Sequence, residues 1–398
     1  MPRPAYELAG IFRQHGAAYR EAHRLSRQQL RVMRAIEVCR TAALGSHVEE
    51  CSQCRHIRIS YNSCRNRHCP KCQNAERAEW LESRKAGLLP VEYFHVVFTL
   101  PEEAARIAFY NQAVVYGILF RAAAETLLTI AGDPKHLGAG IGFFSILHTW
   151  GQNLLYHPHL HCVVPGGGLS PDQQRWVSCR PGFFLPVRVL SRLFRRSFLS
   201  ALGKAFRDGK LRFYGEIESL SEAAAFARYL APLGEREWVV YAKPPFGGPQ
   251  QALEYLGRYI HRVALSNERI LAVQNGEVTF QWKDYRHKDR HKSRVMALPA
   301  DEFIRRFLLH ALPAGFQRIR HFGLLANRHR EQRLALCRQL LTHPVAELLP
   351  PPARCRQLSQ ALASRPPLRC PNCGAGIMIR VGFLPAYRWP AVPPADSS

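Results

Sequence analysis

Residues 157–168 read His-Pro-His-Leu-His-Cys-Val-Val-Pro-Gly-Gly-Gly, an apolar, partly β-branched run that ends in a proline and three glycines. The pattern predicts a β-strand that stops at a turn. Because side chains return to one face of a strand at every second position, the imidazoles of His159 and His161 point the same way. They form a candidate metal site, although two ordinary strand histidines would show the same pattern. The opposite face would pack on a core through Leu160, Cys162 and Val164.

A second predicted strand, Phe143–Trp150, precedes this one across a short loop. The two strands predict a β-hairpin in which residues 147–150 lie opposite residues 158–161. His148 is therefore the preferred third metal ligand. Gln152 is the alternative ligand, and a purely structural His148 fits the sequence equally well.

About a hundred residues downstream, a Pro/Gly-rich loop at 244–249 precedes a predicted amphipathic helix. Tyr255 and Tyr259 are four residues apart on that helix, so they lie about 6 Å from each other along its axis. Packing at the edge of a core would explain two such tyrosines by themselves. Placed after the histidine strand, they become candidate catalytic nucleophiles, and Arg258 and Arg262 beside them become candidate DNA contacts.

Composition restricts the classes of partner. The 398 residues include 55 Lys and Arg against 30 Asp and Glu, a formal charge of +25, and are 47% hydrophobic. A folded chain with this surplus predicts a polyanionic partner, and nucleic acid is the first candidate. The apolar window 116–131 is interrupted by charges, which argues against a membrane partner. Residues 1–40 show no signal-peptide pattern, so we expect a reducing cytoplasm, where clustered cysteines indicate metal sites.

The densest cluster of metal-ligating residues lies between positions 39 and 72. Two Cys-x-x-Cys pairs, Cys51/Cys54 and Cys69/Cys72, are separated by 14 residues, the spacing of a zinc ribbon. How all the candidate ligands divide between one zinc ion and two stays open. The eight candidates are Cys39, His47, Cys51, Cys54, Cys64, His68, Cys69 and Cys72.

Basic side chains stand among these ligands, so the zinc module is also a candidate DNA reader. Arg65, Arg67 and Lys71 are the preferred contacts. A candidate second knuckle, Cys370 and Cys373, lies near the C-terminus, with Cys355 or Cys337 as its completing ligand.

Three features together suit one reaction, the attack of a phenolate on a DNA phosphodiester. They are a divalent ion held by imidazoles, a pair of tyrosines, and a large positive charge. The product would be a 5′-phosphotyrosine and a free 3′-hydroxyl. Because one ester replaces another, the 3′-hydroxyl can reverse the step and rejoin strands.

From about residue 8 to 374, the chain resembles the rolling-circle transposases of the insertion-sequence-91 family, which are HUH endonucleases. The motifs that carry the resemblance are Cys39-Arg40-Thr41 with Gly45-Ser46-His47, then 61–72, 94–101, 148–152, 157–161, 255–262 and 320–325. The resemblance implies that His159 and His161 bind a catalytic Mg²⁺ or Mn²⁺, that Tyr255 and Tyr259 are the nucleophile positions, and that residues 39–72 bind structural Zn²⁺. It also implies an α+β fold, with an antiparallel sheet, helices packed on it and the histidines on a central strand.

The predicted organisation has seven parts. They are a basic helical arm (1–38), a zinc-ribbon-like domain (39–75), a connecting helix (76–90), an HUH catalytic domain (91–300), a helical region (301–341), a Pro-rich linker (342–369), and the Cys knuckle with a disordered tail (370–398). One long helix is expected from 101 to about 131.

The predicted function is a transposase that nicks and rejoins single-stranded transposon ends and target DNA in the bacterial cytoplasm, in association with the nucleoid. A plasmid rolling-circle replication initiator or relaxase is the alternative with the same chemistry. A non-catalytic, zinc-dependent DNA-binding protein is the alternative from another class.

Overall fold

A five-stranded antiparallel sheet carries the histidine strand at its centre. In this computed structural model, which describes residues 4–73, 87–243, 251, 263–283, 293–342 and 368–387, the strand order is β12-β4-β5-β3-β8. The strands are β3 (Tyr93–Thr99), β4 (Gly142–Trp150), β5 (Tyr156–Pro165), β8 (Val240–Lys243) and β12 (Ile319–Gly323). The expected α+β class, with an antiparallel sheet and the histidines on a central strand, is confirmed.

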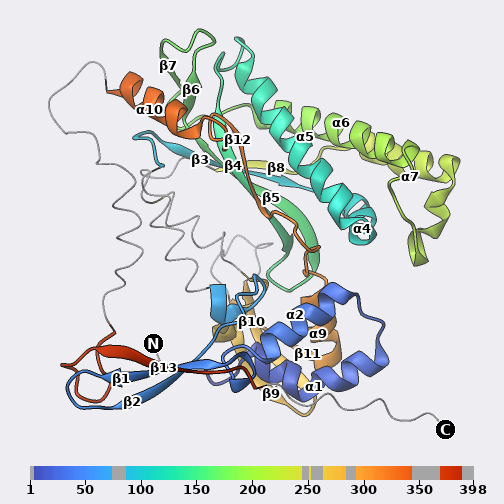
Figure 1. Ribbon diagram of the computed structural model, residues 1–398. Coiled ribbons are helices and arrows are strands. Elements are labelled where there is room, and N and C mark those ends of the chain that lie inside the picture. Colours follow the sequence, from blue (N-terminus) through green and yellow to red (C-terminus); the bar gives the residue numbers. More distant parts are fainter. Residues whose placement is uncertain are drawn as a thin grey trace. The chain divides into compact units, whose positions relative to one another are not determined.

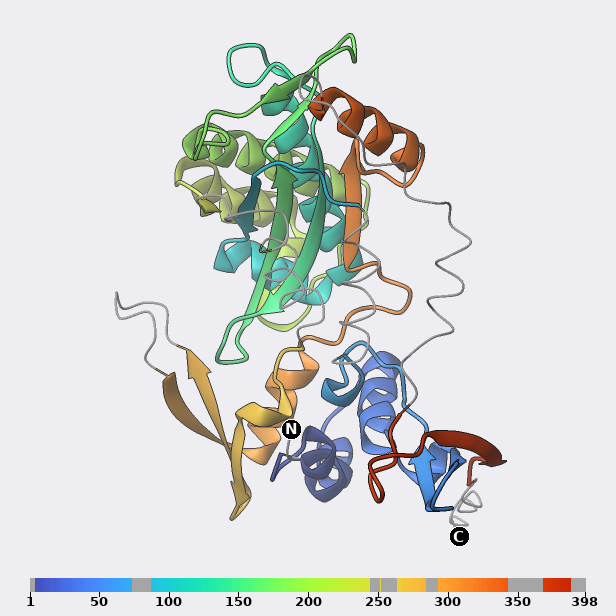
Figure 2. The same ribbon diagram turned by 90° about the vertical axis from the view of Figure 1, so that its left-hand side faces the viewer.

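Helices cover one face of this sheet (Figures 1 and 2). They are α4 (Glu102–Tyr110), α5 (Gln112–Gly132), α6 (Val187–Arg207) and α7 (Ala223–Glu235), with the 3-10 segment η2 (Gly215–Ser221) between α6 and α7. Leu160, Cys162 and Val164 of β5 are fully buried in the core beneath these helices, as the alternation predicted. The strand β5 ends at Pro165, as expected, but only Gly166 lies in the turn, because Gly167 and Gly168 begin a small hairpin of β6 (Gly167–Leu169) with β7 (Trp176–Ser178).

The single helix expected over 101–131 is broken at Asn111. This residue has φ −126° and ψ 39°, outside the helical region, and separates α4 from α5. Its side-chain amide donates to the carbonyl of Arg212 at 2.8 Å and accepts from the Arg212 N–H at 2.7 Å. At this break, the side chain of Asn111 therefore pairs with both backbone polar groups of Arg212, in a distant loop. No local sequence pattern could indicate such a contact.

Helix α5 is the one helix of the described chain that is long and apolar enough to span a membrane, and 61% of its apolar window is buried within the structure. Its buried side chains, from Val115 to Ala131, belong to the core under the sheet. In this protein, the apolar side chains of α5 thus fill the interior of the fold.

A second antiparallel sheet, β11-β10-β9, lies in the same unit with helix α9 against it. Its strands are β9 (Ile270–Gln274), β10 (Glu277–Lys283) and β11 (Ser293–Pro299); η3 (Asn267–Arg269) leads into it, and α9 spans Ala300–Leu308. Phe280 of β10 meets Phe303 of α9 edge to face at 5.7 Å, and both rings are fully buried.

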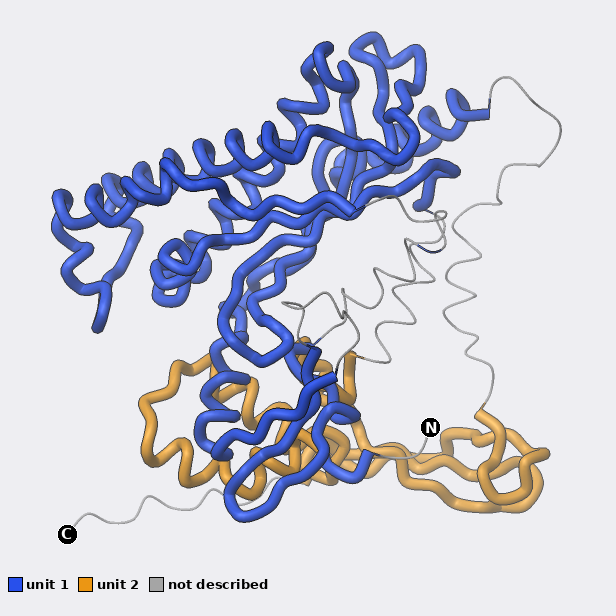
Figure 3. Tube along the Cα trace, turned by 180° about the vertical axis from the view of Figure 1, so that it is seen from behind, with its two compact units in different colours: residues 1–6, 74–345 blue, residues 7–73, 346–398 orange. Residues whose placement is uncertain are grey.

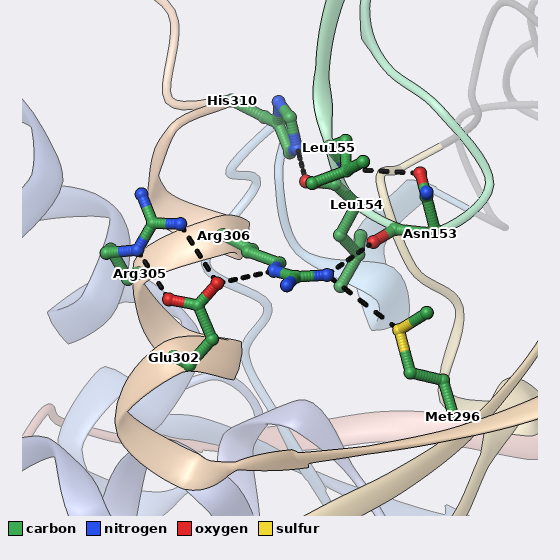
Figure 4. Close-up of polar contacts among 8 residues, drawn as sticks. All are labelled: Asn153, Leu154, Leu155, Met296, Glu302, Arg305, Arg306 and His310. Atoms are coloured by element: carbon green, nitrogen blue, oxygen red, sulfur yellow. Dashed lines mark hydrogen bonds and ion pairs between the residues drawn. The ribbon is translucent and has the colours of Figure 1, made fainter.

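Three consecutive carbonyls of the loop between β4 and β5 accept hydrogen bonds from η3, from α9 and from His310, which follows α9. Arg269 donates to Gln152 O at 2.6 Å, Arg306 to Asn153 O at 3.4 Å, and His310 Nε2 to Leu154 O at 3.1 Å. Figure 4 shows the last two, with Glu302 bridging Arg305 and Arg306. The loop joins the strand of His148 to the strand of His159 and His161, so these contacts fix the hairpin that carries all three.

The region 301–341 was expected to be helical, but it also contributes an edge strand. Between α9 and α10 (Arg330–Leu341), residues of β12 pair with β4, with Phe322 opposite Phe143. Gly323 ends this strand with φ +57°, and a Cβ there would overlap the carbonyl oxygen of Ile141. The strand therefore requires glycine at this position.

A second compact unit combines residues 7–73 with the C-terminal part of the chain (Figure 3). It contains α1 (Leu8–Ala22), α2 (Arg27–Glu37), η1 (Ala42–Leu44), β1 (Ser46–Cys51), β2 (Ile57–Tyr61) and β13 (Met378–Leu384). The strands form a sheet in the order β13-β1-β2. The region expected as a helical arm is thus two helices that bury Ile11, Phe12 and Met33.

Glu302 should make the stability of the larger unit depend on pH. Arg305, and then Arg306, lower the pKa of Glu302 to about 2. A carboxyl whose pKa is lowered by folding stabilises the fold above its ordinary pKa of about 4.5, and this stabilisation is lost as the pH falls from there toward 2. A Glu302→Gln variant should unfold about 2–4 °C below the wild type at pH 7, for a contribution on the order of 1 kcal/mol.

Thermal unfolding followed by circular dichroism at pH 7, 5 and 3 checks this. The difference between the two proteins should shrink toward zero at the lowest pH. Glu235→Gln, at an exposed position on α7, is the matched control. A difference that stays constant over the whole range would contradict the assignment.

Candidate functional site

Three imidazoles come together on the sheet face opposite the helices. His148 of β4 lies directly opposite His159 of β5 in the strand register, and His161 is two residues further along. One ligand nitrogen from each ring lies within 4.8 Å of the others, so a single ion can be reached by all three. His148 and His161 are buried, and His159 is partly exposed. The preferred set of three histidines is thus spatially compatible with one metal centre.

The rings of His159 and His161 are oriented by hydrogen bonds at Nδ1. His159 Nδ1–H donates to the carbonyl oxygen of His157 at 2.6 Å. His161 Nδ1 lies 2.7 Å from Nε2 of His95, which is 2% exposed on the neighbouring strand β3. A metal-binding histidine typically donates its second ring N–H in this way, which leaves Nε2 available for the ion. The donor chemistry of the site therefore fits a divalent cation.

His95 is suited to accept that hydrogen bond because it stays neutral. Burial, together with the smaller effects of the nearby charges of Lys243 and His159, lowers the pKa of His95 to about 3. A neutral ring with its proton on Nδ1 presents a lone pair at Nε2 to the Nδ1–H of His161. The two rings stack at 5.0 Å with 9° between their planes.

Sequence reasoning assigned no role to His95. The signal was present, because His95 stands in the apolar strand run Tyr93–Thr99 in alternation with Val97, which pairs with His161. Pairing between β3 and β5 joins residues 66 positions apart, and a local pattern cannot supply that register.

Gln152, the alternative third ligand, lies in the loop beyond β4, where its carbonyl oxygen accepts from Arg269. The three imidazoles reach one another without it. His148 is held instead by stacking on Trp150, with ring centroids 4.7 Å apart. Both residues are buried.

The predicted nucleophiles, Tyr255 and Tyr259, and the predicted DNA contacts Arg258 and Arg262 lie outside the described residues. The last described strand before them, β8, ends at Lys243, which pairs with His95.

A separate group of four cysteines lies in the smaller unit. Cys39, Cys64, Cys69 and Cys72 place their sulfurs within 4.8 Å of one another, with Sγ–Sγ distances of 3.6 Å from Cys72 to both Cys39 and Cys64. Four thiolates at about 2.3 Å from a tetrahedral zinc are separated by about 3.8 Å, so the spacing fits zinc. Contact with Cys64, then Cys69, lowers the pKa of Cys39 to about 7, whereas contact with Cys39 raises that of Cys64. All four can ionise together only with a cation among them.

The ligands of a single ribbon were expected to include both Cys-x-x-Cys pairs, and the structure divides them differently. Cys51 and Cys54 form the tip of the β1–β2 hairpin, whereas Cys69 and Cys72 follow its open end. Five residues of β2 span about 17 Å, which keeps the two pairs apart. The cysteines near Cys51 and Cys54 are Cys370 and Cys373.

The two histidines of the predicted ligand set stand outside both cysteine groups. His47 lies on β1 with its Nε2 3.4 Å from a Glu49 carboxylate oxygen. His68 lies next to Cys69, and its backbone N–H donates to Asn66 Oδ1 at 2.9 Å. Neither imidazole is needed to complete four sulfur ligands around the first group.

The predicted basic contacts of this unit differ in accessibility. Arg65 is exposed, with φ +50°, and Arg67 is half-buried. Lys71 forms an ion pair with Glu7 at 2.6 Å, which partly neutralises its charge. Arg65 is thus the most accessible of the three to a phosphate.

Comparisons with known proteins identify the family of this chain. The family described as "Putative transposase" matches residues 142–333, and the one described as "Transposase zinc-binding domain" matches residues 11–100. The chain is 62% identical over 393 residues to "Putative transposase y4qJ" of Sinorhizobium fredii (strain NBRC 101917 / NGR234), covering 98% of each chain. It is 28% identical over 347 residues to "Transposase for insertion sequence element IS801" of Pseudomonas savastanoi pv. phaseolicola, covering 85% of this chain and 80% of that one. No solved structure matches. The chain therefore belongs to the insertion-sequence-91 family of transposases, with an N-terminal zinc-binding domain.

Proposed function

We propose that this transposase nicks and rejoins single-stranded DNA at transposon ends through a covalent 5′-phosphotyrosine, the chemistry of rolling-circle transposition. The observation that carries the proposal is the group of three imidazoles on the sheet face opposite the helices. The catalytic assignment goes to His148, His159 and His161 as metal ligands and to Tyr255 and Tyr259 as nucleophile positions.

The chain's own residues would act as follows. A tyrosine loses its proton, and its phenolate oxygen attacks the scissile phosphorus. The bond from phosphorus to the 3′ oxygen breaks, and that oxygen takes up a proton and leaves as a 3′-hydroxyl. His95 and the His157 carbonyl hold His161 and His159 in the tautomer that presents Nε2. When bound there, a divalent cation would supply Lewis-acid stabilisation of charge on the phosphate oxygens.

The ligand atoms of the three histidines influence which catalytic cation the site would bind. Mg²⁺ prefers oxygen ligands, whereas imidazole nitrogens suit transition metals better, and Mn²⁺ accepts both. Three nitrogen donors therefore favour Mn²⁺ over Mg²⁺ in this chain. Zn²⁺ remains the structural ion of the cysteine groups.

The competing readings make different predictions. A replication initiator or relaxase would share the chemistry, but both matching families are transposase families. A non-catalytic DNA-binding protein would not need three imidazoles whose ligand nitrogens lie within 4.8 Å of one another. Since a transposase acts on DNA, we infer that the protein works in the bacterial cytoplasm, in association with the nucleoid.

The nucleophile assignment predicts a covalent adduct. Incubated with Mn²⁺ and a single-stranded oligonucleotide that spans a transposon end, the wild-type protein should acquire DNA in a band that survives denaturation. Tyr255→Phe with Tyr259→Phe should abolish that band. His159→Ala with His161→Ala should reduce it at least about 100-fold.

Tyr241→Phe is the matched control. Tyr241 lies on β8, pairs with the Val97 that also faces His161, and is 46% exposed. This variant should form the adduct as the wild type does. Loss of the adduct in Tyr241→Phe, or its survival in the double tyrosine variant, would reject the assignment. Mass spectrometry of the linked peptide identifies the residue directly.

The orienting role of His95 predicts a defect in metal use. His95→Phe keeps an aromatic ring but removes the acceptor for His161 Nδ1–H, so the Mn²⁺ concentration for half-maximal nicking should rise about 10–100-fold. His95→Gln retains an oxygen acceptor and should be affected less. Excess Mn²⁺ should restore the rate of His95→Phe. A lower maximal rate with an unchanged Mn²⁺ requirement would contradict this role.

A further inference from the structure

The C-terminal segment belongs structurally to the N-terminal unit. Strand β13 pairs antiparallel with β1 along its whole length, from Ser46 opposite Leu384 to Cys51 opposite Met378 (Figures 1 and 2). The Ser52 N–H donates to Ile377 O at 3.0 Å, and the Tyr387 N–H donates to Ala42 O at 3.1 Å. The sheet of the smaller unit is therefore built from both ends of the chain.

Four sulfurs meet where these ends join. The Sγ–Sγ distance is 3.7 Å between Cys51 and Cys373 and 3.7 Å between Cys54 and Cys370, and all four sulfurs lie within 4.8 Å of one another. These separations are far from the ~2.05 Å of a disulfide. They match the ~3.8 Å between thiolates on a tetrahedral zinc ion.

Backbone amides point at these sulfurs from both knuckles. Cys51 Sγ accepts from the N–H of Gln53 at 3.4 Å, Cys370 Sγ from Asn372 at 3.4 Å, and Cys373 Sγ from Gly376 at 3.4 Å. Such donors stabilise the thiolate form that zinc requires.

Gly376 shows how closely the two knuckles fit. A Cβ at this position would lie 2.5 Å from Cys51 Sγ and 3.1 Å from the Cβ of Gln53. A side chain here would push the C-terminal knuckle away from the N-terminal one. Gly382, in the same strand β13, would meet nothing within 4 Å.

The completing ligands expected from sequence do not take part within the described chain. Cys337 is buried in α10 of the larger unit, in a cluster with Leu89, Leu169 and Leu334. Cys355 lies outside the described residues. The match to the transposase zinc-binding domain ends at residue 100, so it includes neither Cys370 nor Cys373.

We propose that Cys51, Cys54, Cys370 and Cys373 form a second structural zinc site, and that this site fastens the C-terminal strand β13 to the N-terminal zinc-binding domain. The ligands of each half are more than 300 residues from those of the other. The zinc module is then discontinuous in sequence, and residues 368–387 are part of it.

Zinc content per chain tests the site. The background should be full-length protein with His159→Ala and His161→Ala, which removes the imidazole group from the count. That protein should carry one zinc per cysteine group, two in all. Cys370→Ser with Cys373→Ser should remove one zinc, and Cys51→Ser with Cys54→Ser should also remove one. The quadruple variant should remove no more than one, because all four residues serve one ion.

Loss of two zinc ions in the quadruple variant, or no loss in the Cys370/Cys373 variant, would overturn the proposal. Cys179→Ser, at a half-buried cysteine outside both groups, should leave the content at two. These outcomes do not depend on DNA cleavage, so they are separable from the proposed chemistry.

Glycine variants test the fit without removing a ligand, which guards against misfolding of the serine variants. Gly376→Ala should lose its second zinc to a competing chelator at about tenfold lower chelator concentration than the wild type. Gly382→Ala should behave as the wild type. Equal retention in the two variants would contradict the contact between Gly376 and Cys51.

Cleavage tests the fastening itself. A protease site placed within residues 343–367 of the full chain allows the C-terminal piece to be cut free. In zinc the piece should remain bound through gel filtration, and a zinc chelator or Cys370→Ser with Cys373→Ser should release it. Release of the piece in the presence of zinc, or its retention after the chelator is added, would overturn the proposed attachment of β13 through zinc.

Discussion

Alternation along β5 is the constraint on which the rest of this structure depends. One face of the strand sends Leu160, Cys162 and Val164 into a core closed by helices, and a shift by one residue would expose them. The register is thereby fixed, and with it the direction of His159 and His161. The precision of the site comes from burial on the far side of the strand, where each apolar side chain stabilises the fold by about 1.5–3 kcal/mol.

Local patterns were enough to predict the strand, the hairpin register that places His148 opposite His159, the α+β class and the presence of clustered metal ligands. They failed where a partner lies far away in the sequence. The division of the cysteines depends on the pairing of β1 with β13, and the role of His95 depends on the pairing of β3 with β5. The break at Asn111 depends on a hydrogen bond to the backbone of Arg212. In each case the deciding contact spans more than sixty residues.

The chemistry of the histidine site is shaped by its lack of charge. Three imidazoles add no negative charge, and the chain carries a formal charge of +25. A divalent cation held there would rely on the phosphate of its DNA substrate for neutralisation, so cation and DNA would each favour binding of the other. The cysteine groups are the opposite case, because four thiolates overcompensate a zinc ion and need backbone N–H groups around them. Under the proposed function, the chain would thus keep its structural and its catalytic cations chemically distinct.

The pairing of β1 with β13 has a consequence for synthesis on the ribosome. Residues 46–61 emerge early, but their sheet is completed only after residue 384 has been translated. At ~5–20 residues per second, the first two strands would wait for about 15–65 seconds for the third. A message that is truncated before codon 384 would yield a protein whose zinc module lacks a strand. Only a chain that extends through β13 would then assemble the whole sheet.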